Sequence, residues 1–209
     1  GKTYACFEPV LDYVIVKIPK WPFKKFLTAS RELGTQMKAT GEVMAIAPSI
    51  EQALMKAIRS LEENVDSLIL PKLQKLSDEE ILQDLKRVDN ERIWVIAEAI
   101  RRGISVDKIH EITTIDKFFI NKVQRIVRIE KRLKTEELTE ELLTTAKKMG
   151  YTDKVISELC GKPQEEIKNI RKEKNIIANF KMVDTCAAEF DATTPYYYSS
   201  YDEENEALE

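Results

Sequence analysis

The sequence has little of what catalytic and cofactor sites are built from. It contains one histidine, His110, so a Ser-His-Asp or Cys-His arrangement could form only around that residue. Its neighbours Ile109 and Ile112 belong to an expected short helix, and we interpret His110 as a structural or solvent-facing residue. The six glycines are scattered, and none stands in the order of a nucleotide-binding loop. We therefore predict no catalytic, cofactor-binding or metal-binding residue in this chain.

Cysteine, long apolar runs and net positive charge are also scarce. Cys6, Cys160 and Cys186 are an odd number of thiols without metal-ligand spacing and without a preceding signal peptide, which favours reduced thiols in the cytoplasm. No apolar run approaches the roughly 20 residues that span a bilayer, and the net charge of -3 gives no overall basic surface. We expect neither a membrane nor a nucleic acid as partner.

Residues 91–133 carry the strongest structural pattern, which predicts three consecutive helices. In the first helix four residues at helical spacing form one apolar stripe: Ile93, Ile96, Ala97 and Ile100. Gly103 ends this helix, Ser105 is the expected N-cap of the second, and Thr114 that of the third. The third helix has an apolar face of Ile115, Phe119, Val123, Ile126, Val127 and Leu133. Phe118, Ile120 and Ile129 widen that face, so we expect cover on two sides, with Ile129 outward in a self-association surface.

The first 62 residues have a different texture, with β-rich segments and prolines. Residues 13–18 and 41–46 are predicted strands, and Ser49 with Gln52 predicts a capping box for a following helix. Two strands and a helix cannot complete a sheet of normal size. We interpret residues 1–62 as the end of a larger α/β domain and residues 63–209 as a helical domain.

Charge is unevenly distributed along the helical part. Residues 115–134 contain seven basic and two acidic residues, whereas residues 184–209 contain eight acidic and no basic residues. The basic helix could be an RNA or anionic-ligand surface, but we favour neutralisation by acidic segments of the same chain or of a second subunit, with the tail from Asp184 as the first candidate.

Residues 152–174 have the spacing of a helix-turn-helix. Gly161 provides the turn, Ser157 precedes it by four residues, and Ile167 follows it by six. A DNA-binding reading would place four basic residues in the major groove: Lys168, Arg171, Lys172 and Lys174. Glu165 and Glu166 would then face phosphates, so DNA binding is kept only as the alternative to a structural pair of helices.

Several longer segments closely resemble the large subunit of carbamoyl-phosphate synthetase. The helical and C-terminal matches are 92–93 (RI), 97–103 (AEAIRRG), 115–116 (ID), 118–119 (FF), 181–190 (KMVDTCAAEF), 194–201 (TPYYYSSY) and 202–206 (DEENE). The N-terminal matches are 7–9 (FEP), 12–19 (DYVIVKIP) and 36–46 (QMKATGEVMAI). Phe118 stands where the family commonly has tryptophan, and Ile120 where it has leucine.

The resemblance implies a mainly α fold: a helical oligomerisation domain preceded by a small α/β remnant of the first ATP-grasp domain, and closed by an acidic C-terminal strap. It also implies a parent ligase that makes carbamoyl phosphate from bicarbonate, ATP and glutamine-derived ammonia, with Mg or Mn and a glutaminase small subunit, for pyrimidine and arginine synthesis. The family's Glu-x-Asn-Pro-Arg motif is expected upstream of Gly1. Here Asn205 is followed by Glu206 and not by the Pro-Arg of that motif, so no ATP or metal ligand is carried over to this sequence. We expect the fragment alone to be inactive.

Overall fold

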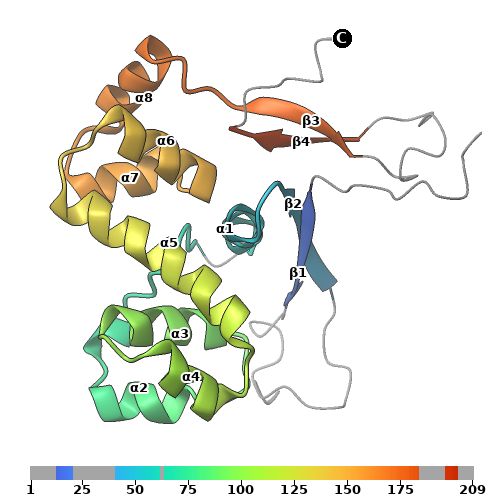
Figure 1. The fold of residues 1–209 in the computed structure, drawn as a ribbon, viewed down its shortest axis with the longest axis vertical. Coiled ribbons are helices and arrows are strands. Elements are labelled where there is room, and N and C mark those ends of the chain that lie inside the picture. Colours follow the sequence, from blue (N-terminus) through green and yellow to red (C-terminus); the bar gives the residue numbers. More distant parts are fainter. Residues whose placement is uncertain (1–12, 21–40, 62–63, 184–195, 202–209) are drawn as a thin grey trace, which may run out of the picture.

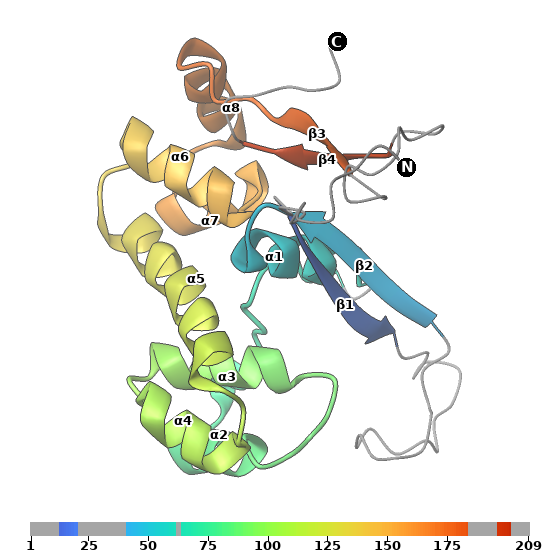
Figure 2. The ribbon, with the colours of Figure 1, turned by 45° about the vertical axis from the view of Figure 1, so that its right-hand side comes forward.

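The computed structural model describes residues 13–20, 41–61, 64–183 and 196–201 (Figures 1 and 2). Within these residues the chain forms eight α-helices, one short 3-10 helix and two separate two-stranded sheets. The fold is mainly α, as the sequence predicts. The predicted domain boundary, between residues 62 and 63, lies outside the described residues.

Helix α5 (Lys117–Thr135) is the longest helix of the described part and connects two groups of helices (Figure 1). Its first half contacts α3 and α4, and its second half contacts α6 and α7. Because neighbours cover it on several sides, a wide arc of α5 is buried: Ile120, Val123, Ile126, Val127, Ile129, Glu130 and Leu133. The predicted cover on two sides is confirmed.

Two positions on α5 differ from the prediction. Ile129, expected to face outward, is 6% exposed and belongs to the main hydrophobic core, whereas Phe119, expected on the inner face, is 53% exposed. The side of the helix that is buried is the side that neighbouring helices cover. Because apolar residues occur on most sides of α5, their spacing in the sequence does not identify that side. Phe118 and Phe119, at the start of α5, are both exposed.

Three helices form the group beside the start of α5: α2 (Asp78–Asp84), α3 (Arg92–Arg101) and α4 (Val106–Thr113). Residues 94–99 of α3 are all buried, because α2, α4, α5 and the 3-10 turn η1 (Leu73–Lys75) surround that helix. The apolar face predicted for α3 therefore included fewer residues than the helix buries. The indole of Trp94 donates a hydrogen bond to the Ser67 carbonyl at 3.0 Å, which satisfies its buried N–H.

The helix caps follow the prediction with one exception. Ser105 accepts from the Lys108 amide at 3.1 Å, as predicted. At the start of α2, Ser77 and Glu80 form a complete capping box. Thr114, however, ends α4 in a left-handed conformation at φ 58°, and Asp116 caps α5 by accepting from the Phe118 amide. The acidic cap suits the positive end of the helix dipole, which explains why Asp116 takes this position.

The second group contains α6 (Glu140–Met149), α7 (Asp153–Cys160) and α8 (Gln164–Glu173). Thr139 and Thr152 cap α6 and α7, and glycines in left-handed conformations end both helices. Tyr151, in the turn between them, is buried and donates a hydrogen bond to the Ile126 carbonyl of α5 at 2.7 Å. This bond fixes the turn against the central helix.

Helix α1 (Ile50–Ser60) lies between the helical groups and a hairpin of β1 (Val14–Lys20) and β2 (Gly41–Ala47) (Figure 2). The strands are antiparallel, with Val14 opposite Ala47 and Lys20 opposite Gly41. Met55 and Ile58 of α1 enter the main core, and Ala57 packs with the hairpin. Ser49 caps α1 by accepting from the Gln52 amide, which is the first half of the predicted capping box.

A second hairpin, β3 (Asn179–Val183) with β4 (Tyr196–Ser200), was not predicted. The resemblance implied an acidic C-terminal strap in this part of the chain, most of which, residues 184–195 and 202–209, lies outside the described residues. β4 contacts β2, and Tyr198 packs against the ring of Tyr13 at 5.9 Å. In the view of Figure 1, β1 and β2 lie to the right of α1, and β3 and β4 run across above it.

Candidate functional site

His110 has a structural role in the turn that leads into α5. Its Nδ1 lies 2.7 Å from the carbonyl oxygen of Ile115, so a protonated Nδ1 donates a hydrogen bond across the α4–α5 connection. The side chain is half-buried. This contact agrees with the structural interpretation of His110 drawn from the sequence.

The predicted helix pair around Gly161 is confirmed, but its basic side chains contact residues of the same chain. Arg171 bonds Asp153 and the Ile176 carbonyl. Lys168 pairs with Glu165 at 2.9 Å, and Lys174 pairs with Glu140 at 3.3 Å. Three of the four cations proposed for a DNA groove therefore have internal partners, and the geometry favours the structural interpretation.

The positive charge of α5 is also largely balanced within the described residues. The buried carboxylate of Glu51, on α1, lies 3.0 Å from Arg125 and 3.6 Å from Lys122. Other basic residues of α5 pair with Asp107, Glu130 and Glu136. Neutralisation of α5 by acidic residues of the same chain is therefore confirmed for these side chains. The acidic residues 184–195 and 202–209 lie outside the described residues, so their proposed contact with α5 stays a prediction.

A nearly buried cluster of charges joins α3 to α5. The Arg101 guanidinium donates two hydrogen bonds to Glu130, from Nε at 2.9 Å and from Nη2 at 2.8 Å. Glu98 accepts from both Arg101 and Arg102 at 3.1 Å, and Lys134 reaches Glu130 at 2.9 Å. Arg102 also donates to the carbonyls of Leu73 and Leu76. Residues 97–103 (AEAIRRG), one of the segments that resemble the family, thus connect α3 by hydrogen bonds and ion pairs both to the turn before α2 and to α5.

The start of α5 presents two exposed aromatic side chains, Phe118 and Phe119. They are 49% and 53% exposed, and their rings make an edge-to-face contact with centroids 5.3 Å apart. The ammonium of Lys122 lies 5.1 Å from the centre of the Phe118 ring. Large exposed aromatic groups held by a rigid helix are typical of contact surfaces between proteins.

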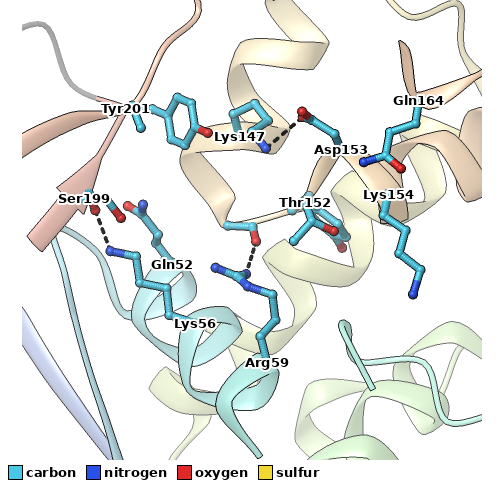
Figure 3. Close-up of a pocket in the computed structure, with 13 residues that line it drawn as sticks. Gln52, Lys56, Arg59, Lys147, Thr152, Asp153, Lys154, Gln164, Ser199 and Tyr201 are labelled. Carbon is cyan, nitrogen blue, oxygen red and sulfur yellow. Dashed lines mark hydrogen bonds and ion pairs between the residues drawn. The ribbon is translucent and has the colours of Figure 1, made fainter. Parts of the chain in front are cut away.

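A polar cavity of about 290 Å³ lies where α1, the α6–α7 turn and the end of β4 meet (Figure 3). Lys56 and Arg59 extend into it from α1, and Lys147 and Asp153 line the opposite side at 3.0 Å from each other. Burial is the main cause that lowers the pKa of each of these two lysines and of Arg59. Sequence reasoning missed this cavity, because its walls come from segments about 50 to 150 residues apart.

The described residues hold no group of three or more histidine, cysteine, aspartate or glutamate side chains arranged to bind a metal ion. Nor does any helix among them have both the length and the apolar content needed to cross a membrane. The prediction that the chain carries no catalytic, cofactor-binding or metal-binding residue stays a prediction.

Comparison with known proteins points to one family over the whole chain. Residues 42–175 match the family model described as "Carbamoyl-phosphate synthetase large chain, oligomerisation domain". The chain is 59% identical over 208 residues to the carbamoyl phosphate synthase large chain of Agathobacter rectalis, covering 100% of this chain and 20% of that relative. It is 57% identical over 207 residues to the large chain of Lachnoclostridium phytofermentans, covering 99% of this chain and 19% of the relative. The chain therefore spans about a fifth of the length of these relatives.

Proposed function

Because the chain belongs to the family of carbamoyl-phosphate synthetase large chains, we propose that it is the scaffold and self-association segment of such an enzyme. The observation that carries the proposal is the family match over residues 42–175, which is specific to an oligomerisation domain. The arrangement of α5 supports the same role. A helix that is held by two helical groups and also presents exposed phenylalanines can transmit a subunit contact to the whole domain.

We propose that the parent enzyme makes carbamoyl phosphate from bicarbonate, ATP and ammonia released from glutamine by a small glutaminase subunit. It would be a cytoplasmic ATP-dependent ligase that uses Mg or Mn. The identity of 59% to the carbamoyl phosphate synthase large chain of Agathobacter rectalis supports this assignment. The β1–β2–α1 unit would be the end of an ATP-grasp domain, since its two strands leave Ile15 and Met44 exposed on one face.

The first test is light scattering on the chain over a range of concentrations. We expect a concentration-dependent rise in the average mass toward that of a symmetric dimer, which is the commonest closed assembly. A chain that stays monomeric at high micromolar concentration would contradict the self-association role.

The second test is calorimetric titration of the chain with Mg-ATP. We expect no saturable binding, because the sequence has neither a phosphate-binding loop nor the carboxylate-asparagine motif of the family. Saturable micromolar binding would place a nucleotide site within the segment and would contradict a purely structural role.

A further inference from the structure

The cavity between α1, the α6–α7 turn and β4 has more positive than negative charge in its wall. Four cationic side chains line it, from two separate parts of the chain: Lys56, Arg59, Lys147 and Lys154. Asp153 is the one acidic residue among the lining residues. The overall sequence has a net charge of -3, so this excess of positive charge is a local feature.

The two acidic side chains near the cavity already have close cationic partners. Asp153 accepts from Lys147 at 3.0 Å and also from Arg171, which lies just outside the lining. Asp66 accepts from Lys154 at 3.1 Å. Asp66 also favours the charged form of Arg59, but burial outweighs it and lowers the pKa of Arg59. Within the described residues, the carboxylates bonded in these pairs are not bonded to the two cations of α1.

Lys56 and Arg59 bond main-chain oxygens instead of carboxylates. Lys56 donates to the carbonyls of Ile46 and Ser199, and Arg59 donates to the carbonyl of Gly150. Among the described residues, neither cation forms an ion pair with a carboxylate. Burial and then the charge of Arg59 lower the pKa of Lys56 to about 8, which is the response expected of a cation short of negative charge.

The remaining polar groups of the wall are suited to an anion. Thr152 and Tyr201 carry hydroxyl groups that can donate, and Gln52 and Gln164 carry amide N–H groups. Figure 3 shows Gln52 and Lys56 on one side of the cavity and Lys147 on the other. The volume of about 290 Å³ lies at the small end of ligand pockets, which excludes large cofactors.

We propose that this cavity binds a small phosphate-type oxyanion, either inorganic phosphate or the phosphate group of a small ester. Lys56 and Arg59 of α1 are the side chains that hold it, and Lys147 of α6, which also pairs with Asp153, adds positive charge on the opposite side. The bound anion connects α1 to the α6–α7 turn and to the end of β4. Because it binds the folded state, it stabilises the contact between the N-terminal hairpin unit and the helical domain.

The test is calorimetric titration of the full chain with inorganic phosphate, in buffer whose ionic strength is matched with chloride. We expect saturable binding to one site and a rise in melting temperature with phosphate that chloride at equal ionic strength does not produce. The absence of saturable binding, or an equal rise with chloride, would overturn the proposal.

Three variants locate the site. Lys56→Gln removes one charged hydrogen-bond donor and should weaken phosphate binding about tenfold. Lys154→Gln, on the exposed rim, should retain the fold and weaken binding about two- to fivefold, because it removes a positive charge from the cavity wall. Lys168→Gln is the matched control, because that lysine pairs with Glu165 on α8 outside the cavity.

If Lys56→Gln fails to fold, the comparison of Lys154→Gln with Lys168→Gln shows whether phosphate binds in this cavity. Equal binding by Lys154→Gln and Lys168→Gln would overturn the assignment to this cavity.

Discussion

Glu130 is the side chain whose environment most clearly links sequence to fold. It is 3% exposed, and its carboxylate accepts hydrogen bonds from Arg101 on α3 and Lys134 on α5. Burying a carboxylate costs free energy unless cations and hydrogen bonds compensate it, and here both are present. The segment 97–103 supplies Glu98 and Arg101 together, so the motif shared with the family is a structural charge cluster in this chain.

Replacing Glu130 by Gln should therefore reduce the free energy of unfolding by about 3–5 kcal/mol, because Arg101 would keep a buried charge without its main partner. Glu136→Gln is the matched control, since Glu136 pairs with Arg132 at the surface and its loss should cost at most about 1 kcal/mol. Urea denaturation of both variants measures the difference. Similar costs for the two substitutions would show that the buried cluster contributes no more than a surface pair.

Lys56 gives the folded chain a defined pH dependence. Its pKa is about 8 in the folded state against 10.5 for an ordinary lysine, so between these values the unfolded chain binds more protons. The contribution of this site to the free energy of unfolding therefore rises as pH increases from about 8 to 10.5. Burial is the main cause of the lowered pKa of Lys56 and the charge of Arg59 the second, and the Tyr198 ring lies 5.8 Å from the ammonium.

Lys56→Met keeps the apolar stem and removes the titrating group, so it should reduce this rise, and the part that remains comes from other groups such as Lys147, whose pKa burial also lowers. Denaturant midpoints measured across the same pH window, with Lys168→Met as the control that keeps the rise, test the expectation. Parallel pH profiles for the original chain and Lys56→Met would contradict the desolvation of Lys56.

The contact between α1 and the end of α6 depends on the absence of a side chain at Gly150. A Cβ atom there would lie 2.8 Å from the Cβ of Met55, and the backbone has φ +99°. Gly161 ends α7 at φ +74° with no heavy atom within 4 Å of the corresponding position. Substituting the two glycines in turn therefore distinguishes two contributions to the free energy of unfolding. Gly161 reports the conformational cost alone, and Gly150 reports that cost together with the cost of crowding α1.

Gly161→Ala should reduce the free energy of unfolding by about 1–2 kcal/mol, the cost of a left-handed alanine. Gly150→Ala should cost about 2–5 kcal/mol, because overpacking against α1 adds to that conformational cost. Denaturation curves for both variants provide the measurement. Equal costs would mean that α1 moves away freely from the end of α6.

The helices were predictable because their signals are local. Thr139, Thr152 and Ser105 are caps within a few residues of the helices they start, and Gly103, Gly150 and Gly161 follow helix ends. The partners across the fold were not predictable. Glu51 faces α5, and Arg59 meets Gly150, only because α1 packs there, and periodicity along one helix does not determine its neighbours.

The same limit explains the errors on α5. Ile129 and Phe119 are both apolar residues on a helix with apolar side chains around most of its circumference, so their spacing alone assigned them wrongly. The cavity was missed for a related reason: its cations are ordinary surface-type residues in the sequence, and only the fold brings them together. The resemblance to the family predicted which protein the chain comes from, whereas the caps, glycines and apolar spacing predicted its helices.

For the chain as a whole, α5 connects the two helical groups to α1, and its first residues present the exposed aromatic pair. Self-association through Phe118 and Phe119 would bury apolar area that a monomer leaves in water. An aromatic anchor at the centre of such an interface typically contributes about 2 kcal/mol or more, which corresponds to about 30-fold in the dissociation constant.

Sedimentation equilibrium of the original chain and of Phe119→Glu tests this account most directly. We expect the original chain to self-associate, and Phe119→Glu to weaken the association at least about 30-fold with an unchanged circular dichroism spectrum. Ile129→Glu should instead unfold the chain, because that side chain lies in the core. A monomeric original chain, or undiminished association of Phe119→Glu, would contradict the assignment of this surface.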